Sequence, residues 1–384
     1  MGLTGVSQGR GSAAGGEARA AEYVQDQLSK LGIQDVRTQA FLGLRSIWFF
    51  LALTFGVALS GHTAFWLLRI PIDSLPAVGV SVLIFGFSAL LLWRKFTFGD
   101  YPLRDYLPHG PSQNLVAVLP AKQELRERIV LVAHLDSHRA VWWFASDVLV
   151  KIYTFLAPLG VYGVVIAPLL YLLTAVSGMA VFSWLGAALA LVHFVSWFTG
   201  MTADLGPYSP GANDNASAVG TLLALAERLS KASLKYTEVW LAFTGCEETG
   251  CDGMRALLDE HGDKLSEALF IDFELVGIGE RLVYLQSEGV VRRQRISNRV
   301  EALISDVGSR FGIEPIQGAG MGAFTEMGTV WERGFEGVCL LALRENSNLF
   351  PEWHRLTDTA DRLQAETLER VHELGWALLQ RVDG

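Results

Sequence analysis

Two long apolar blocks, at residues 46–93 and 141–200, interrupt a chain that otherwise alternates polar and apolar positions. Each block holds two apolar stretches long enough for a helix that crosses a bilayer, which takes about 17–25 residues. The four stretches are Ser46–Leu68, Ala77–Trp93, Ile152–Val176 and Met179–Thr199. Buried helices of soluble proteins are seldom this long without a polar face. The pattern therefore predicts four transmembrane helices.

The two stretches within each block are joined by short links, Arg69–Pro76 and Ser177–Gly178. Each pair is therefore expected to form a hairpin that returns to the side it left, which puts all polar segments on one face of the membrane. Basic residues flank the hairpins on the polar side at Arg45, Arg94, Lys95, Arg139 and Lys151. Because cytoplasmic loops carry an excess of Lys and Arg, the polar side is expected in the cytoplasm. Residues 1–40 show no signal-peptide pattern, which agrees.

The polar segments alternate short apolar runs, typical of buried strands, with amphipathic helical patterns. The expected strands are Leu115–Leu119, Ile129–Ala133, Val239–Phe243, Leu269–Phe273, Leu282–Leu285 and Val338–Leu343. The expected helices are Glu17–Gly32, Ser217–Leu229, Arg295–Phe311 and Glu366–Val382. This alternation predicts a three-layer α/β/α sandwich on a mainly parallel mixed sheet. Its domain would comprise residues 1–45, 94–140 and 201–384, interrupted by the hairpins 46–93 and 141–200.

Composition narrows the range of partners. The formal net charge is -9, and no basic stripe is visible, which argues against nucleic acid. Three cysteines are too few for a disulfide framework, so free thiols are expected, although the sequence leaves a pair between Cys246 and Cys251 open. The expected partner at this point is a lipid bilayer, and the oligomeric state is left open.

Residues of metal-binding type follow the predicted strands. His134, the pair Glu247-Glu248, and Glu274 each come directly after one, and ligand sites in such sheets form at the carboxyl ends of strands. Two zinc ions can share a bridging carboxylate and need His and carboxylate ligands beside an uncoordinated base. The sequence offers five ligands (His134, Asp214, Glu248, Glu274 and His354), Glu247 as the base, and Asp136 to orient the His134 ring.

Five motifs, in this order, resemble those of the M28 metallopeptidases, the dinuclear-zinc aminopeptidase clan. They are Gly9-Arg10-Gly11-Ser12, Ala133-His134-Leu135-Asp136-Ser137, Gly211-Ala212-Asn213-Asp214-Asn215-Ala216-Ser217, Glu247-Glu248 and the segment from His354 to Asp361. The resemblance covers essentially all the polar sequence. It implies one zinc on His134, Asp214 and Glu274, and a second on Asp214, Glu248 and His354. It also implies Glu247 as general base and a peptide substrate, cleaved as by an aminopeptidase.

Two departures from the family pattern stand out. The family usually has aspartate where this chain has Glu274, which leaves Asp272 as an alternative ligand. His134 and Asp214 lie 80 residues apart, where a short loop is usual, and the second hairpin fills the interval.

Two other functions stay open at this stage. One is a non-catalytic scaffold or receptor of the same fold, and the other is a glutaminyl-cyclase-like transferase that uses one zinc. Asp358 and Asp361 are interpreted as helix-start residues and not as ligands, and His138 is given no role.

Overall fold

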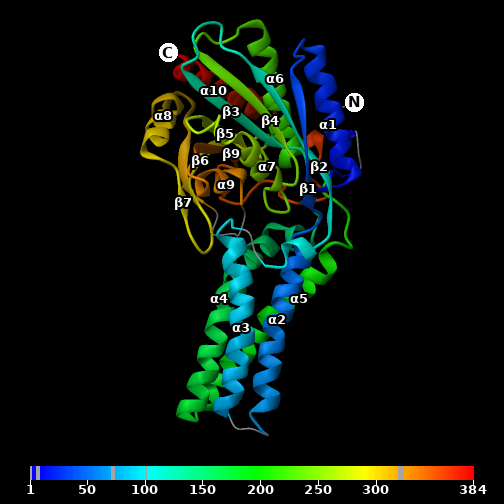
Figure 1. Cartoon of the computed structure of the whole chain (residues 1–384), viewed down its shortest axis with the longest axis vertical. Coiled ribbons are helices and arrows are strands. Elements are labelled where there is room, and N and C mark those ends of the chain that lie inside the picture. Colours follow the sequence, from blue (N-terminus) through cyan, green and yellow to red (C-terminus); the bar gives the residue numbers. More distant parts are fainter. Residues whose placement is uncertain (1, 6–8, 71–73, 100–101, 319–323) are drawn as a thin grey trace.

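An α/β domain and a bundle of four long helices make up the molecule, with the bundle projecting from one end of the domain (Figure 1). The computed structural model describes residues 2–5, 9–70, 74–99, 102–318 and 324–384. Both ends of the chain lie in the α/β domain (Figure 1).

One nine-stranded sheet forms the centre of the domain, in the order β1-β2-β4-β3-β5-β9-β6-β7, with β8 paired to β6. The four central strands, β4, β3, β5 and β9, run parallel, whereas β1, β2, β6 and β7 pair antiparallel toward the edges. The strands are β1 Val36–Leu44, β2 His109–Leu119, β3 Glu127–His134, β4 Thr237–Thr244, β5 Leu269–Phe273, β6 Arg281–Glu288, β7 Gln294–Arg295, β8 Glu314–Gln317 and β9 Glu336–Leu343. The predicted mixed sheet is confirmed, and its parallel part is the centre.

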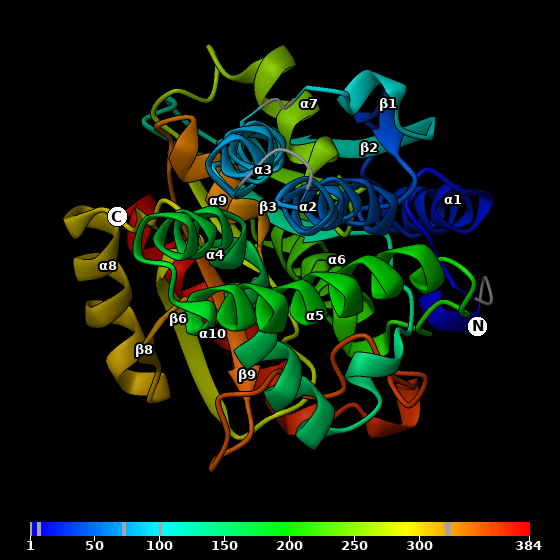
Figure 2. The same cartoon turned by 90° about the horizontal axis from the view of Figure 1, so that it is seen from below.

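Helices cover both faces of this sheet, which confirms the three-layer sandwich (Figure 2). One face carries α1 (Gly15–Lys30), α6 (Ser217–Lys231), α8 (Asn298–Gly308) and α10 (Ala365–Asp383), and the other carries α7 (Asp252–His261) and α9 (Glu326–Glu332). Because both faces are covered, the parallel strands are almost continuously apolar, as in the fully buried run Ile129–Ala133 of β3. Cys246, Cys251 and Cys339 are buried free thiols.

The bundle consists of two helix pairs, each long and apolar enough to cross a membrane. The helices are α2 (Trp48–Leu68), α3 (Ser74–Phe96), α4 (Asp147–Ser177) and α5 (Ala180–Ala203). Each packs against two neighbours in the ring α2-α3-α4-α5. Their outer faces expose large apolar side chains, such as Leu83 at 77%, Phe155 at 71% and Val176 at 74%.

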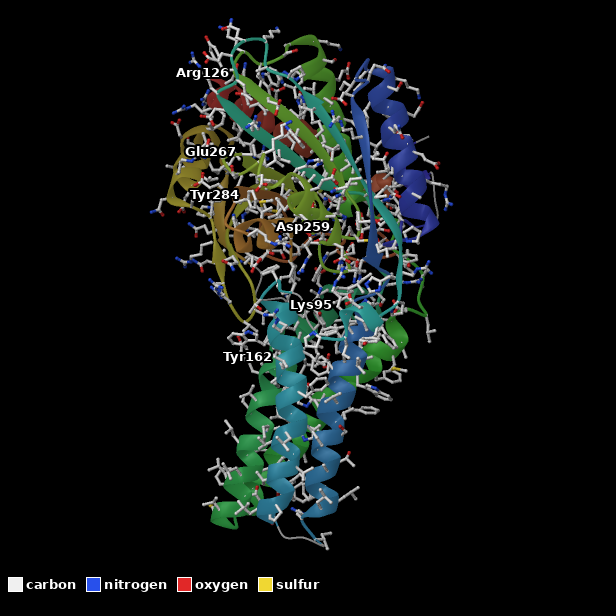
Figure 3. All side chains as sticks on the ribbon, viewed as in Figure 1. Lys95, Arg126, Tyr162, Asp259, Glu267 and Tyr284 are labelled. Atoms are coloured by element: carbon white, nitrogen blue, oxygen red, sulfur yellow. The ribbon has the colours of Figure 1, made fainter. Side chains whose placement is uncertain are left out.

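Hydrogen bonds fix the bundle to the loops at one edge of the sheet. Lys95, at the end of α3, donates from Nζ to the Thr249 carbonyl over 3.2 Å. Tyr162 of α4 donates to the Val290 carbonyl over 2.8 Å. Lys95 and Tyr162 both lie where the bundle meets the domain (Figure 3). The bundle is therefore held against the loop that follows β4 and the loop that joins β6 to β7.

Candidate metal centre

The three adjacent parallel strands β4, β3 and β5 end at the same edge of the sheet, and each delivers a side chain there. His134 is the last residue of β3, Glu247 and Glu248 lie in the turn after β4, and Glu274 follows β5 directly. Two loops complete the group with Asp214, in the irregular turn Ala212–Ala216, and His354, after β9. The structure thus brings together all the ligand and base candidates that the sequence suggested, on side chains at most 9% exposed.

Asp214 stands between the two histidines. Its Oδ1 lies 3.3 Å from His134 Nε2, and its Oδ2 lies 3.4 Å from His354 Nε2. Glu274 Oε2 is 3.3 Å from His134 Nε2, and Glu248 Oε2 is 3.1 Å from His354 Nε2. Two groups of candidate ligands result, one around His134 and one around His354, and the carboxylate of Asp214 turns one oxygen toward each histidine.

Asp136 links the segment after β3 to the turn after β4 by hydrogen bonds. Its Oδ1 lies 3.4 Å from His134 Nδ1, on the side of the ring away from the ligand group. The carboxylate also accepts hydrogen bonds from the amides of Glu247 and Glu248, at 3.1 and 3.2 Å, and from Ser12 Oγ at 2.6 Å. A carboxylate in this place fixes the orientation of the imidazole and the position of the Glu247-Glu248 turn.

The turn that carries Asp214 is held by a residue that the sequence analysis misjudged. Asp358 is buried, and its carboxylate accepts hydrogen bonds from the backbone amides of Asn213 at 2.7 Å and Asp214 at 3.1 Å. The expectation that Asp358 starts a helix is wrong, because the next helical turn begins only at Ala360. Asp358 lies in the closing motif from His354 to Asp361, but the motif does not reveal this contact, since its partners are backbone groups.

Two further residues position the ligands and were given no role beforehand. Asn215 donates from Nδ2 to Glu274 Oε2 over 3.0 Å. Arg10 is fully buried and donates to the carbonyls of Leu135 and Gly211, at 2.7 and 2.8 Å. The available signal for Arg10 was its place in the glycine-flanked motif near the start of the chain.

Two further residues need placing: His138, which was given no role, and Asp272, the alternative to Glu274 as a ligand. The His138 ring stacks on His354 with centroids 3.7 Å apart, and its Nδ1 lies 2.8 Å from the Arg139 carbonyl. His138, Glu248 and His354 form a group whose ligand atoms lie within 4.8 Å of one another. Asp272 belongs to none of the possible metal groups among the described residues, and its two carboxylate oxygens have no hydrogen-bond partner there.

The electrostatics of the cluster fit a bound cation. Burial raises the pKa of Glu248 and of Glu274 to about 8, and raises that of Glu247 well above its usual range. Burial also lowers the pKa of His354 to about 4, so its imidazole stays neutral. Buried carboxylates in such numbers need protons or a positive ion, and metal binding releases those protons. Histidine nitrogens with carboxylate oxygens are donors that suit zinc.

Comparisons with known proteins agree with this fold. The structure is similar to a zinc aminopeptidase from Bacillus subtilis, with a TM-score of 0.57 and 13% identity over 99% of this chain and 93% of that one. It is also similar to a Zn-dependent exopeptidase from Parabacteroides distasonis, with a TM-score of 0.55 and 12% identity over 99% and 94%. A glutaminyl cyclase from Tannerella forsythia gives a TM-score of 0.54 and 13% identity over 98% and 94%. At these identities the likeness concerns the fold. Comparison with curated protein sequences gives no match.

The family assignment rests on the sequence. The sequence model of peptidase family M28 matches residues 191–379, which include Asp214, Glu247, Glu248, Glu274 and His354. The match begins within α5 and ends within α10, so it covers the second half of the domain and most of the cluster. By this match, residues 191–379 are similar to peptidase family M28, and the fold of the whole chain agrees with that of zinc exopeptidases.

Proposed function

We propose that the protein is a membrane-anchored exopeptidase with two zinc ions, acting as an aminopeptidase. The observation that carries the proposal is the place of Asp214, whose two oxygens face His134 and His354 at 3.3 and 3.4 Å. A carboxylate shared in this way is what a pair of ions about 3.5–4 Å apart requires.

The ligand sets follow from the two groups. His134, Asp214 and Glu274 would hold one zinc, and Asp214, Glu248 and His354 would hold the other. His138 is close enough to the second group to contribute a nitrogen. Asp136 is assigned the role of orienting His134 and the Glu247-Glu248 turn.

Glu247 is assigned the role of general base. Its Oε2 lies 4.0 Å from His134 Nε2, so it faces the cluster without occupying either pair of close contacts. When bound, zinc supplies Lewis acidity, which polarises a carbonyl and lowers the pKa of water. The Glu247 carboxylate takes a proton from the attacking water and passes it to the leaving amine.

Membrane insertion is part of the proposal. Helices α2–α5 would cross the bilayer as two hairpins, and residues 1–45, 94–140 and 201–384 would form one peptidase domain on the cytoplasmic side. The apolar outer faces of the four helices support insertion, because soluble proteins rarely expose apolar patches of this extent. The basic residues that flank the hairpins support the cytoplasmic side.

Zinc stoichiometry separates the proposal from its two rivals. The purified protein, in bilayer nanodiscs, should contain two zinc ions and release the N-terminal residue from short peptides. One zinc with cyclisation of N-terminal glutamine would instead support a cyclase, and no bound zinc would support a scaffold. The position of Asp214 between His134 and His354, with one oxygen facing each, favours two ions.

A further inference from the structure

A cavity of about 150 Å³ lies directly against the metal-binding cluster. Part of its wall is the cluster itself, with Asp214, Glu247, Glu248, Glu274 and His354. Much of the remaining wall comes from the long helices: Trp48 and Leu51 of α2, Phe96 of α3, and Tyr153, Ala157 and Val161 of α4. The cavity is therefore acidic where the chemistry would occur and largely apolar where the helices line it.

The wall residues of α4 share one face of that helix. Tyr153, Ala157 and Val161 are spaced by four residues, and residues four apart lie on the same side of a helix. Each is only half-buried, as the wall of a cavity requires. Trp48 and Leu51, three apart in the first turn of α2, likewise share a face.

The length of α4 gives the level of this wall relative to a bilayer. Its 31 residues span about 46 Å at 1.5 Å each, whereas the hydrocarbon core is about 30 Å thick. If the end at Ser177 reaches the far boundary, the near boundary falls roughly ten residues in from Asp147, close to Ala157. The helix wall of the cavity therefore lies near the surface of the hydrocarbon.

We propose that this cavity receives the apolar N-terminal side chain of a peptide lying at the membrane surface, and that Ala157 and Val161 set the size of that side chain. The proposal rests on the aminopeptidase function proposed above. An apolar cavity of about 150 Å³ holds a group the size of benzene, which suits an aromatic or branched side chain and is too small for a lipid acyl chain.

The first experiment measures kcat/KM for a series of aminoacyl substrates with the zinc-loaded full chain in nanodiscs. Wild type should cleave Phe and Leu substrates at least 10-fold better than Ala, Lys or Glu substrates. In Ala157→Phe the added ring reduces the cavity. The rates on Phe and Leu should then fall at least 10-fold and the rate on Ala less than threefold, since one methylene in an apolar pocket is worth about 10–200-fold.

Two variants make the result specific. Leu169→Phe adds the same ring to the outer face of α4, where Leu169 is 55% exposed, and should leave the preference unchanged. Val161→Ala enlarges the cavity and should raise the rate on a Trp substrate relative to Ala, which keeps the test open if Ala157→Phe does not fold. Equal rates on all substrates in wild type, or a uniform loss in Ala157→Phe, would overturn the assignment of the cavity.

The second experiment tests the membrane surface as the source of the substrate. One peptide with N-terminal Phe is offered free in solution or tethered to the nanodisc by a C-terminal acyl group. At equal total concentration the tethered peptide should be cleaved at least 10-fold faster, and equal rates would overturn this part. Cleavage of N-fatty-acyl leucine without cleavage of leucyl substrates would assign the cavity to an acyl chain and so overturn the whole inference. Failure of the proposed function looks different, because wild type with two zinc ions would then cleave no aminoacyl substrate.

Discussion

Replacing Asp136 by asparagine tests how much the cluster depends on one carboxylate that is not proposed as a ligand. Asp136 Oδ1 meets the Glu247 amide and His134 Nδ1, and Oδ2 meets Ser12 Oγ and the Glu248 amide. Whichever way the new amide turns, its NH₂ group faces one of the two backbone amides, that of Glu247 or that of Glu248, and this hydrogen bond is lost. A hydrogen bond to a charged group is worth about 1.5–3 kcal/mol. We therefore expect about 2 kcal/mol of destabilisation.

Zinc affinity should fall in parallel, because the His134 ring and the turn that carries Glu248 lose their orientation. Loss of such an orienting partner typically costs 10–100-fold in metal affinity. Competition with a chromogenic chelator measures the affinity, and thermal unfolding in detergent measures the stability. Asp361→Asn is the matched control, since Asp361 is exposed in the closing motif and should change neither quantity. Unchanged zinc affinity in Asp136→Asn would refute the orienting role.

Three further outcomes are expected. Glu247→Gln should keep both zinc ions and lose about 10²–10⁴-fold in turnover, as removal of a general base does, and near-normal peptidase activity would contradict that role. Asp214→Asn should lower the occupancy of both zinc positions together, and elemental analysis showing the loss of only one would mean that Asp214 does not bridge. Burial raises the pKa of Glu288 from 4.5 to about 8, so its neutral form is favoured in the folded state and its stabilising contribution is lost as the pH rises toward 8. The glutamine in Glu288→Gln is neutral at every pH and can still accept the hydrogen bond from the Thr325 amide. The melting temperature of this variant, relative to that of wild type, should therefore rise between pH 5 and pH 8. A difference that does not change with pH would contradict this.

Long elements with a strong pattern could be predicted from the sequence. The four apolar helices and the buried strands β3, β4, β5 and β9 come from continuous apolar runs, which burial or a bilayer requires. The elements that were missed have weaker patterns. Strand β1 lies at an edge and is only partly buried, so its alternation is blurred, and α9 has seven residues, too few to show a helical period.

The candidate ligands could be predicted for the same reason, since they lie at or near the ends of recognisable strands or in recognisable motifs. The positioning roles of Asp358 and Asn215 could not be predicted, because they depend on contacts between segments far apart in the sequence. The hydrogen bond from the Asp214 amide to Asp358 joins residues 144 positions apart, and no periodicity in the chain reports it. The choice between Asp272 and Glu274 also needed the structure, because only the position of the side chain shows that Glu274 reaches His134.

His134 and Asp214 lie 80 positions apart in the sequence, yet the insertion between them is closed at its base. The Ser209 amide donates to the His138 carbonyl and the Ala140 amide to the Pro207 carbonyl, each over 2.9 Å. The segment that leads into the second hairpin is therefore paired with the segment that leaves it. Arg10 also links the two segments, because its guanidinium donates hydrogen bonds to the Leu135 carbonyl and to the Gly211 carbonyl. For the metal cluster the second hairpin therefore acts as a short loop would. Its helix α4, by contrast, supplies a wall of the adjoining cavity. If the proposed function holds, the base of the insertion would support metal binding and α4 would shape substrate access, so substitutions in α4 should alter substrate preference without changing zinc affinity.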